Sequence, residues 1–280
     1  MTTTLKITLM VLAVAALACG GTIKIPDVPT AGPTKVDEIN VPAPTSGETR
    51  LTLSFGAGEL KLTPGAANLV EGTASYNLDD LKPQVITDGS SVEIKQEDLL
   101  RLVEPSGVKS VWDFKLGSSP MDLSINAGAY EGDFELGGLS LTGLTVKDGA
   151  ASVDLSFSKP NPVAMTVLRY ETGASQVELT GLANANFSTM LMSSGAGDYA
   201  LDFTGDLKRD ATITITTGLS NIELVIPRGI PATLTADTEL TNVNVGSSWK
   251  MDGNRYTQTG TGPTLTFIIK GGAGNLTLSD

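Results

Sequence analysis

Five acidic side chains recur in the same local setting and are the groups in this sequence best placed for chemistry. Each lies between two apolar residues, and together they are Glu135, Asp154, Glu178, Asp202 and Glu223. In a strand, the central residue of such a run points away from its two neighbours, so buried flanks would put the acids outside. Strands stacked in register at about 4.8 Å would then align five carboxylates in a ladder. Oxygen ligands in flexible geometry suit calcium, so we predict a candidate cation ladder; a solvated, screened face is the alternative.

Other catalytic chemistry finds little support in the residue types. The sequence contains no histidine, which removes the commonest general base and a common metal ligand. No serine–lysine motif is present to activate the many serines and threonines. The glycine-rich stretches are not followed by a helix pattern, so none qualifies as a phosphate cradle. We therefore predict no catalytic residues and a protein that is not an enzyme.

A glycan-cleaving enzyme is the least favoured alternative, because it needs two carboxylates that face each other across a groove. The formal net charge is −12 and no basic patch is present, which excludes nucleic acid as a partner.

Two aromatic residues are candidates for a contact with a partner. Trp249 and Tyr256 lie in the polar segment "VGSSWKMDGNRYTQTG", which interrupts the glycine repeat described next. An insertion that interrupts a repeat is a candidate contact site, so we predict a contact hairpin here. The alternative is a hairpin that only caps the last strands. Trp112 lies in a strand pattern and is expected in the core.

The elements that must position these residues follow from a repeat. Glycine recurs at positions 128, 149, 173, 195 and 218, at steps of 21, 24, 22 and 23 residues. Each period holds two alternating runs separated by proline and glycine turns, which predicts half-buried strands. We predict an all-β fold, a β-solenoid of stacked short strands with rungs of about 22 residues. A meander sandwich is the rival architecture.

The register of the apolar residues predicts which side chains are buried. The expected core residues are Val153, Leu155, Val177, Leu179, Ile222 and Leu224. The acids between them, Asp154, Glu178 and Glu223, are expected to be exposed.

A family resemblance agrees with this architecture. A tryptophan strand, a proline-led strand, a glycine–alanine pair and an apolar–acid–apolar run occur at Trp112, Pro120, Gly128, Ala129 and 134–136. This pattern resembles the toast-rack family of bacterial envelope proteins and is similar to the C-terminal domain of Lia-type cell-wall-antibiotic-response proteins. The resemblance covers about residues 49–280 and implies a stack of short strands outside the cell. Its motifs are structural, so it implies nothing about chemistry.

The first residues predict export and anchoring. Lys6 and the apolar run that ends in "ALAC" resemble a bacterial lipoprotein signal, so residues 1–18 are predicted to be cleaved and Cys19 to be acylated. Cleavage of an ordinary secretory signal near Ala18 is the alternative. We expect a Pro/Thr-rich tether over 19–47, an N-terminal β region over 48–120, and a repetitive solenoid over 121–280 that continues it.

Together these features predict a surface-anchored lipoprotein that acts as a structural, adhesion or interaction module. The expected location is the bacterial cell envelope, outside the cytoplasm, on a membrane reached through the acyl chains of Cys19. The expected partner is a protein or an envelope polymer, and the oligomeric state is left open. An envelope-stress or partner-binding component of the Lia type is the alternative, although the membrane helices that precede that domain in Lia-type proteins are not found here.

Overall fold

A computed structural model describes residues 31–44, 47–96, 107–238 and 242–280. Residues 31–280 form one compact unit, and the description below concerns this unit. Among the described residues, strands alternate with turns and two short 3₁₀ helices, η1 (Asp79–Leu81) and η2 (Leu182–Ala185). None of the helices in the described part is long and apolar enough to cross a membrane.

Five long strands form the centre of the unit, and each runs through a bend near its middle. These strands are β2 (Thr49–Pro64), β7 (Met121–Glu135), β10 (Met165–Thr180), β11 (Phe187–Asp202) and β12 (Ala211–Val225). Other rungs consist of two separate strands, namely β5 (Ser91–Lys95) with β6 (Ser110–Leu116), β8 (Leu141–Asp148) with β9 (Ala150–Ser156), β13 (Ala232–Thr238) with β14 (Asn242–Val245), and β17 (Leu265–Gly271) with β18 (Gly274–Ser279). The remaining strands are β1 (Lys35–Val41), β3 (Val70–Tyr76), β4 (Gln84–Asp88), β15 (Trp249–Asp252) and β16 (Arg255–Gln258).

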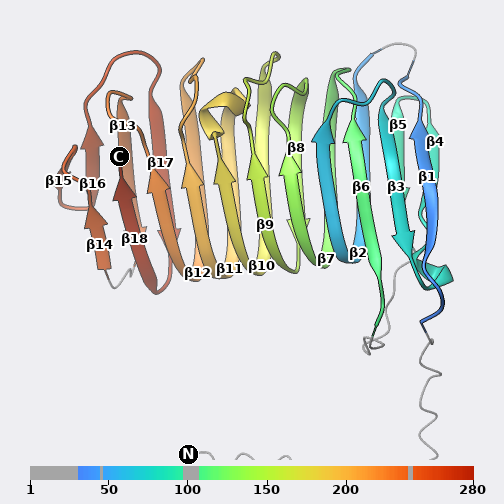
Figure 1. Cartoon of the computed structure of the whole chain (residues 1–280). Helices are drawn as coiled ribbons and strands as arrows, with labels where there is room; N and C mark the ends of the chain where they lie inside the picture. Colours follow the sequence, from blue (N-terminus) through green and yellow to red (C-terminus); the bar gives the residue numbers. More distant parts are fainter. Residues whose placement is uncertain (1–30, 45–46, 97–106, 239–241) are drawn as a thin grey trace, which may run out of the picture. The chain divides into compact units, whose positions relative to one another are not determined.

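The bends fold the strands into two walls with the core between them (Figure 1). The first wall contains the parts of the rungs before the bend, in the order β4, β5, β2, β7, β8, β10, β11, β12, β17, β13, β16, β15. The second wall contains the parts after the bend, in the order β1, β3, β6, β2, β7, β9, β10, β11, β12, β18, β14. Neighbouring central rungs pair in parallel, which confirms the stacked solenoid and excludes an antiparallel meander.

The recurring glycine lies at the bend because two backbones meet there closely. A Cβ on Gly195 would lie 2.5 Å from the carbonyl oxygen of Gly173, and one on Gly218 would lie 2.5 Å from that of Gly195. No real side chain tolerates such a distance without movement of the backbone. The same approach, at 2.4–2.6 Å, recurs at Gly128, Gly173 and Gly272, and it is looser at Gly149, at 3.1 Å. Together with Gly56, whose carbonyl oxygen faces Gly128, we call these residues the bend column: Gly56, Gly128, Gly149, Gly173, Gly195, Gly218 and Gly272.

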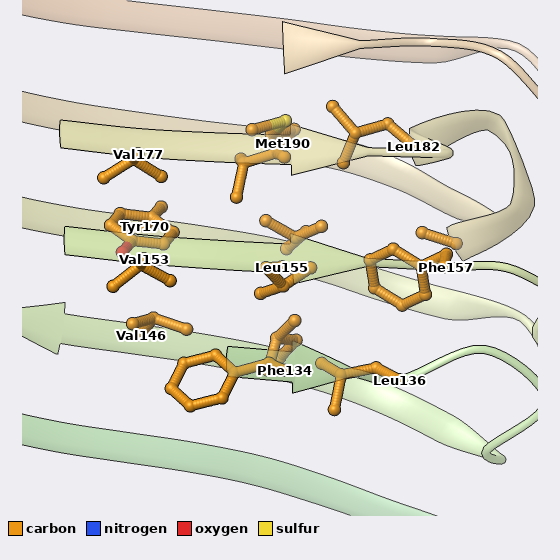
Figure 2. Close-up of a cluster of buried hydrophobic side chains, with 14 of the residues drawn as sticks. Phe134, Leu136, Val146, Val153, Leu155, Phe157, Tyr170, Val177, Leu182 and Met190 are labelled. Carbon is orange, nitrogen blue, oxygen red and sulfur yellow. The ribbon is translucent and has the colours of Figure 1, made fainter. Parts of the chain in front are cut away.

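Aliphatic and aromatic side chains fill the space between the walls (Figure 2). Val153, Leu155 and Phe157 of one rung stack on equivalent residues of the next, such as Val177. The predicted core is confirmed, since its members are at most 2% exposed: Val153, Leu155, Val177, Leu179, Ile222 and Leu224. Burying each such side chain stabilises the fold by about 1.5–3 kcal/mol. Trp112 is also buried, edge-on to Phe55 at a centroid distance of 5.0 Å.

The structure corrects the predicted tether at its C-terminal side. Residues Lys35–Val41 form β1, which pairs antiparallel with β3. Ile39 and Val41 are buried in the core, so the ordered stack begins inside the range 19–47. The missed signal is the alternation of Ile39 and Val41 with polar residues in "KVDEINV".

The order of the rungs departs from the order of the sequence at both ends. From β7 to β12, each rung pairs with the one before it in the chain. At one end, however, β2 lies between β7 and the β5–β6 rung. At the other end, the β17–β18 rung lies between β12 and the β13–β14 rung, as Figure 1 shows.

Candidate functional site

Carboxylates on the outer face of the second wall form a column at a fixed offset from the bend. Four acids lie five residues after a glycine of the bend column: Asp133, Asp154, Glu178 and Glu223. Strand pairing places Asp133 opposite Asp154 and Asp154 opposite Glu178. Ala200 separates Glu178 from Glu223. Because the inward neighbours are buried, the side chains of these acids point to solvent, and we call the four residues the acidic column.

The predicted five-residue ladder is wrong at Glu135 and Asp202. Both lie two positions beyond the acidic column, where Glu135 is in register with Ser156. Glu135 accepts hydrogen bonds from the Gly137 backbone N–H at 2.5 Å and from the Ser156 hydroxyl at 2.9 Å. Asp202 accepts the backbone N–H of Thr204 at 2.7 Å and its hydroxyl at 3.0 Å. These carboxylates close turns at the strand ends, as short acidic side chains commonly do.

A second row of polar side chains runs beside the acidic column. It lies three residues after the last four bend glycines, at Gln176, Asp198, Asn221 and Asn275, and continues in register on β14 with Asn242. Asn221 Nδ2 donates to Asp198 Oδ1 at 2.7 Å, and Asn275 Nδ2 donates to Asn221 Oδ1 at 2.6 Å. Asn242 Nδ2 donates to Asn275 Oδ1 at 3.1 Å. We call this set the amide row, and its hydrogen bonds hold four neighbouring strands together on the outside.

The two rows line an open concavity of about 690 Å³ on the second wall. Its polar lining includes Asp154, Glu178, Asp198, Asn221, Glu223 and Asn275. The floor is formed by strands whose opposite faces carry the core, so the position of each side chain follows from the strand register. A rigid sheet presents such groups more precisely than a loop does.

The concavity has an excess of negative charge without basic partners. Lys61 occupies the equivalent position on β2 and pairs with Asp133, with 3.5 Å between Nζ and Oδ2. Asp154, Glu178 and Glu223 form no ion pair with any residue that the structure describes. No group of three or more His, Cys, Asp or Glu residues in the described ranges could hold a metal ion. The face therefore offers carboxylates and amides for contact, without a preformed metal cage.

The sequence also matches a family model, described as the N-terminal domain of toast-rack, over residues 30–180. This match covers more than half of the chain. The chain belongs to the toast-rack family.

The chain was also compared with solved structures, and one of them has a similar fold. A candidate cell adhesion protein from Clostridium sporogenes is 19% identical, with a TM-score of 0.50 over 88% of this chain and 99% of that chain. Candidate adhesins from Bacteroides fragilis and Parabacteroides merdae are each 10% identical, with TM-scores of 0.35; they cover 88% and 89% of this chain and 97% and 98% of their own. At 19% identity, the likeness to the Clostridium protein concerns the fold alone. A comparison with curated proteins finds no matching sequence.

Inside the toast-rack stack, a polar cluster beside the bend column was not predicted from the sequence. Tyr170 donates to Asp148 Oδ2 at 3.0 Å, and Ser175 and Thr172 donate to Oδ1. Tyr130 lies at 3.5 Å from the same carboxylate. Burial, together with the negative charge of Asp148, raises the pKa of Tyr130 and of Tyr170 well above the ordinary range. The cluster satisfies polar groups inside the bend, and its two tyrosines stay neutral.

The predicted contact hairpin is wrong for both aromatic rings. The hairpin itself exists as β15 and β16, paired antiparallel at one end of the toast-rack stack. Trp249 is 7% exposed and Tyr256 is 5% exposed, and both belong to the core cluster. They cover the end of the core next to β13, which was the alternative interpretation of this segment. Neither ring is available to a partner on the surface.

The predicted lipidation site, Cys19, lies outside the described residues, as do the predicted signal (1–18) and the tether up to residue 30.

Proposed function

We propose that this toast-rack protein is a non-enzymatic, adhesion-like binding module of the cell envelope, and that it contacts its partner through the second wall. The observation that carries the proposal is the concavity in which Asp154, Glu178 and Glu223 project without ionic partners. Carboxylates on neighbouring strands repel one another and destabilise the pairing. Ala200 and Thr277 occupy the same column, so the fold accepts uncharged residues there. Asp154 and Glu178, which are direct register partners, therefore cost stability where the fold does not need them, which supports a role in binding.

The chemistry of the face indicates the class of partner. Carboxylates and amide oxygens accept hydrogen bonds from hydroxyl, amide and ammonium groups, and the amide nitrogens donate in return. The acidic column and the amide row extend over several rungs, which suits an extended polymer or a protein surface better than a small molecule. The structural neighbour from Clostridium sporogenes, described as a candidate cell adhesion protein, supports an adhesive role of this kind.

The proposed location is the outside of the cell, on a membrane. The proposed arrangement has a cleaved signal over 1–18, an acyl anchor at Cys19 and a tether that leads into the stack. A tether of Pro-rich composition is extended and semi-rigid, so it would hold the acidic face away from the bilayer. The toast-rack membership supports an envelope protein, and the anchor itself is tested by Cys19→Ser. This variant should appear in the medium or as an uncleaved precursor, and a mature-sized species in the membrane fraction would contradict acylation.

The binding face is tested by adhesion of protein-coated beads to bacterial cells that carry the chain. Beads with the triple variant Asp154→Asn, Glu178→Gln, Glu223→Gln should lose most of the adhesion shown by the wild-type protein. Protease treatment of the cells then separates a protein partner from a polymer.

The matched control removes three acids from the outer face of the first wall: Asp122→Asn, Glu93→Gln and Asp237→Asn. It changes the net charge equally, so it should adhere like the wild-type protein. Equal loss in both triple variants would reduce the effect to net charge, and full adhesion of the second-wall variant would overturn the proposed contact face.

A further inference from the structure

The β17–β18 rung occupies its slot out of sequence order. After β12 the chain leaves the stack, builds the β13–β14 rung and the β15–β16 hairpin, and only then returns to insert β17–β18 between β12 and β13–β14 (Figure 1). The slot is therefore bounded by two rungs that both precede the inserted rung in the chain. A segment of six residues, 259–264, connects the inserted rung to β16.

Both neighbours contact the inserted rung in the same register. Leu265 lies opposite Ala211 on one side and opposite Ala232 on the other. Leu276 likewise lies between Ile222 and Val243. With the rung absent, β12 and β13–β14 could pair directly, and no side chain would move to the wrong face of the sheet. The register of the stack thus does not depend on which copy of the rung fills the slot.

The contacts that hold the β17–β18 rung in place are made by residues that surround the slot. Gly272 fits over Gly218, where a Cβ would lie 2.6 Å from the Gly218 carbonyl oxygen, and Phe267 packs edge-on against Phe203 at 5.0 Å. At the start of the rung, Asp210 Oδ1 accepts the Thr264 backbone N–H at 2.7 Å. The same rung from another chain would meet each of these groups unchanged.

At the end of the rung, the side chain of Asp280 accepts hydrogen bonds from the slot. Arg228 donates to it through Nη2 at 2.6 Å and through Nε at 2.8 Å, and Ser248 donates through its hydroxyl. The hairpin at this end of the stack carries Lys250 and Arg255 together with Asp252, so it adds no net acidic charge that would keep two copies apart.

We propose that β17–β18 of one copy can fill the slot between β12 and β13–β14 of another, so that the partner of this end of the stack is a second copy of the chain. Exchange of an identical element costs little free energy, because each slot is filled by the same residues whether the rung belongs to its own chain or to the other copy. The exchanged rung contributes β18, and with it Asn275, to the concavity on the second wall. A rung from another copy would restore the same surface, and no acid of the acidic column belongs to the exchanged rung.

The test uses two proteins that each carry one thiol, because Cys19 is the only cysteine in the sequence. The full chain with Cys19→Ser receives either Asn221→Cys or Asn275→Cys, at register partners on β12 and β18 whose side chains are 2.6 Å apart. The two proteins are mixed, incubated and treated with a short bis-maleimide. The expected product contains one chain of each kind, at twice the 29.0 kDa of a single chain, and accumulates with incubation time.

The matched control pair is Gln176→Cys mixed with Asp198→Cys. These residues lie in the same row of the same wall, but on β10 and β11, which follow each other in the chain and stay inside the stack. The control should give only the product of random collision. One chain that carries both Asn221→Cys and Asn275→Cys should cross-link internally, which verifies the fold and the reach of the reagent. If this double variant reacts internally while the mixed pair gives no more interchain product than the control, the proposed exchange is overturned.

Discussion

The bend column and the acidic column have the same spacing and follow opposite rules. Both lie at a fixed offset within each rung, since the acidic column is five residues after the bend glycine. The bend position holds glycine on all seven rungs of the column. The acidic position also holds Lys61, Ala200 and Thr277. One column admits a single residue type and the other does not.

The two columns differ because the backbone restricts the residue type at the bend, whereas the exposed acidic position is not restricted in this way. At five of these glycines, a Cβ would lie 2.4–2.6 Å from a carbonyl oxygen of the neighbouring rung, so the restriction there is steric. At the acidic position, the side chain points to solvent and any residue compatible with a strand fits. The fold therefore explains the glycines but not the acids at Asp154, Glu178 and Glu223, which contact a partner under the proposed function.

The strongest contrast is expected between adjacent residues that point in opposite directions. Leu179→Ala should lower the free energy of unfolding by about 2–5 kcal/mol, because it leaves a cavity between the walls. Glu178→Gln, one residue earlier and exposed, should change it by no more than about 0.5 kcal/mol. Urea denaturation followed by far-UV circular dichroism measures both. Similar losses for the two variants would mean that the strand faces are assigned wrongly.

The bend column can be tested against the acidic column within one rung. Gly195→Ala should cost about 1–3 kcal/mol, because its Cβ forces the neighbouring backbone to move. The Cβ would lie 2.5 Å from the Gly173 carbonyl oxygen. Ala200→Glu fills the gap in the acidic column between Glu178 and Glu223. Because it adds like-charge neighbours, it should lower the stability, but by less than about 1 kcal/mol. A tolerated Gly195→Ala in the same denaturation experiment would remove the steric explanation of the repeat.

The tyrosines beside the bend predict how the stability depends on alkaline pH. Their pKa values in the folded protein are raised above the ordinary value of 10.0 by burial and by Asp148. Above pH 10 the unfolded chain loses these protons and the folded chain keeps them, so their contribution is complete below pH 10 and is lost as the pH rises.

Tyr130→Phe combined with Tyr170→Phe should lower the stability at neutral pH through lost hydrogen bonds, and should flatten the alkaline decline. The measurement is the slope of the unfolding free energy between about pH 8 and pH 11. An unchanged slope would show that other groups cause the decline.

The smallest effect is expected from cations on the acidic column. Since no described group of three ligands could hold a metal ion, millimolar calcium should raise the melting temperature no more than sodium chloride of matched ionic strength. The triple variant of Asp154, Glu178 and Glu223 provides the control in the same thermal melts. A calcium-specific rise that the triple variant lacks would show a cation site on this face.

The sequence was sufficient for the fold class and for the direction of the side chains, because glycine spacing and apolar alternation both follow from the backbone. It was insufficient for the register of the acids. Phe134–Glu135–Leu136 matches the local pattern, but only the distance from Gly128 identifies Asp133 as the member of the column. The insertion of β17–β18 between β12 and β13 could not be predicted either. Both neighbours pair with β17 in the same register, so the spacing of the repeat in the sequence does not reveal the order of the rungs in the stack.

The amide row gives the proposed binding face a direction. Asp198 is a carboxylate that only accepts, so Asn221 must present its nitrogen to it and its oxygen to Asn275, which in turn presents its oxygen to Asn242. The dipoles of the three carboxamides, Asn221, Asn275 and Asn242, consequently point the same way along the stack. The row ends on the negative charge of Asp198. A polymer laid along this face would meet different ends at β11 and β14. A chain with chemically distinct termini would therefore bind preferentially in one of its two orientations.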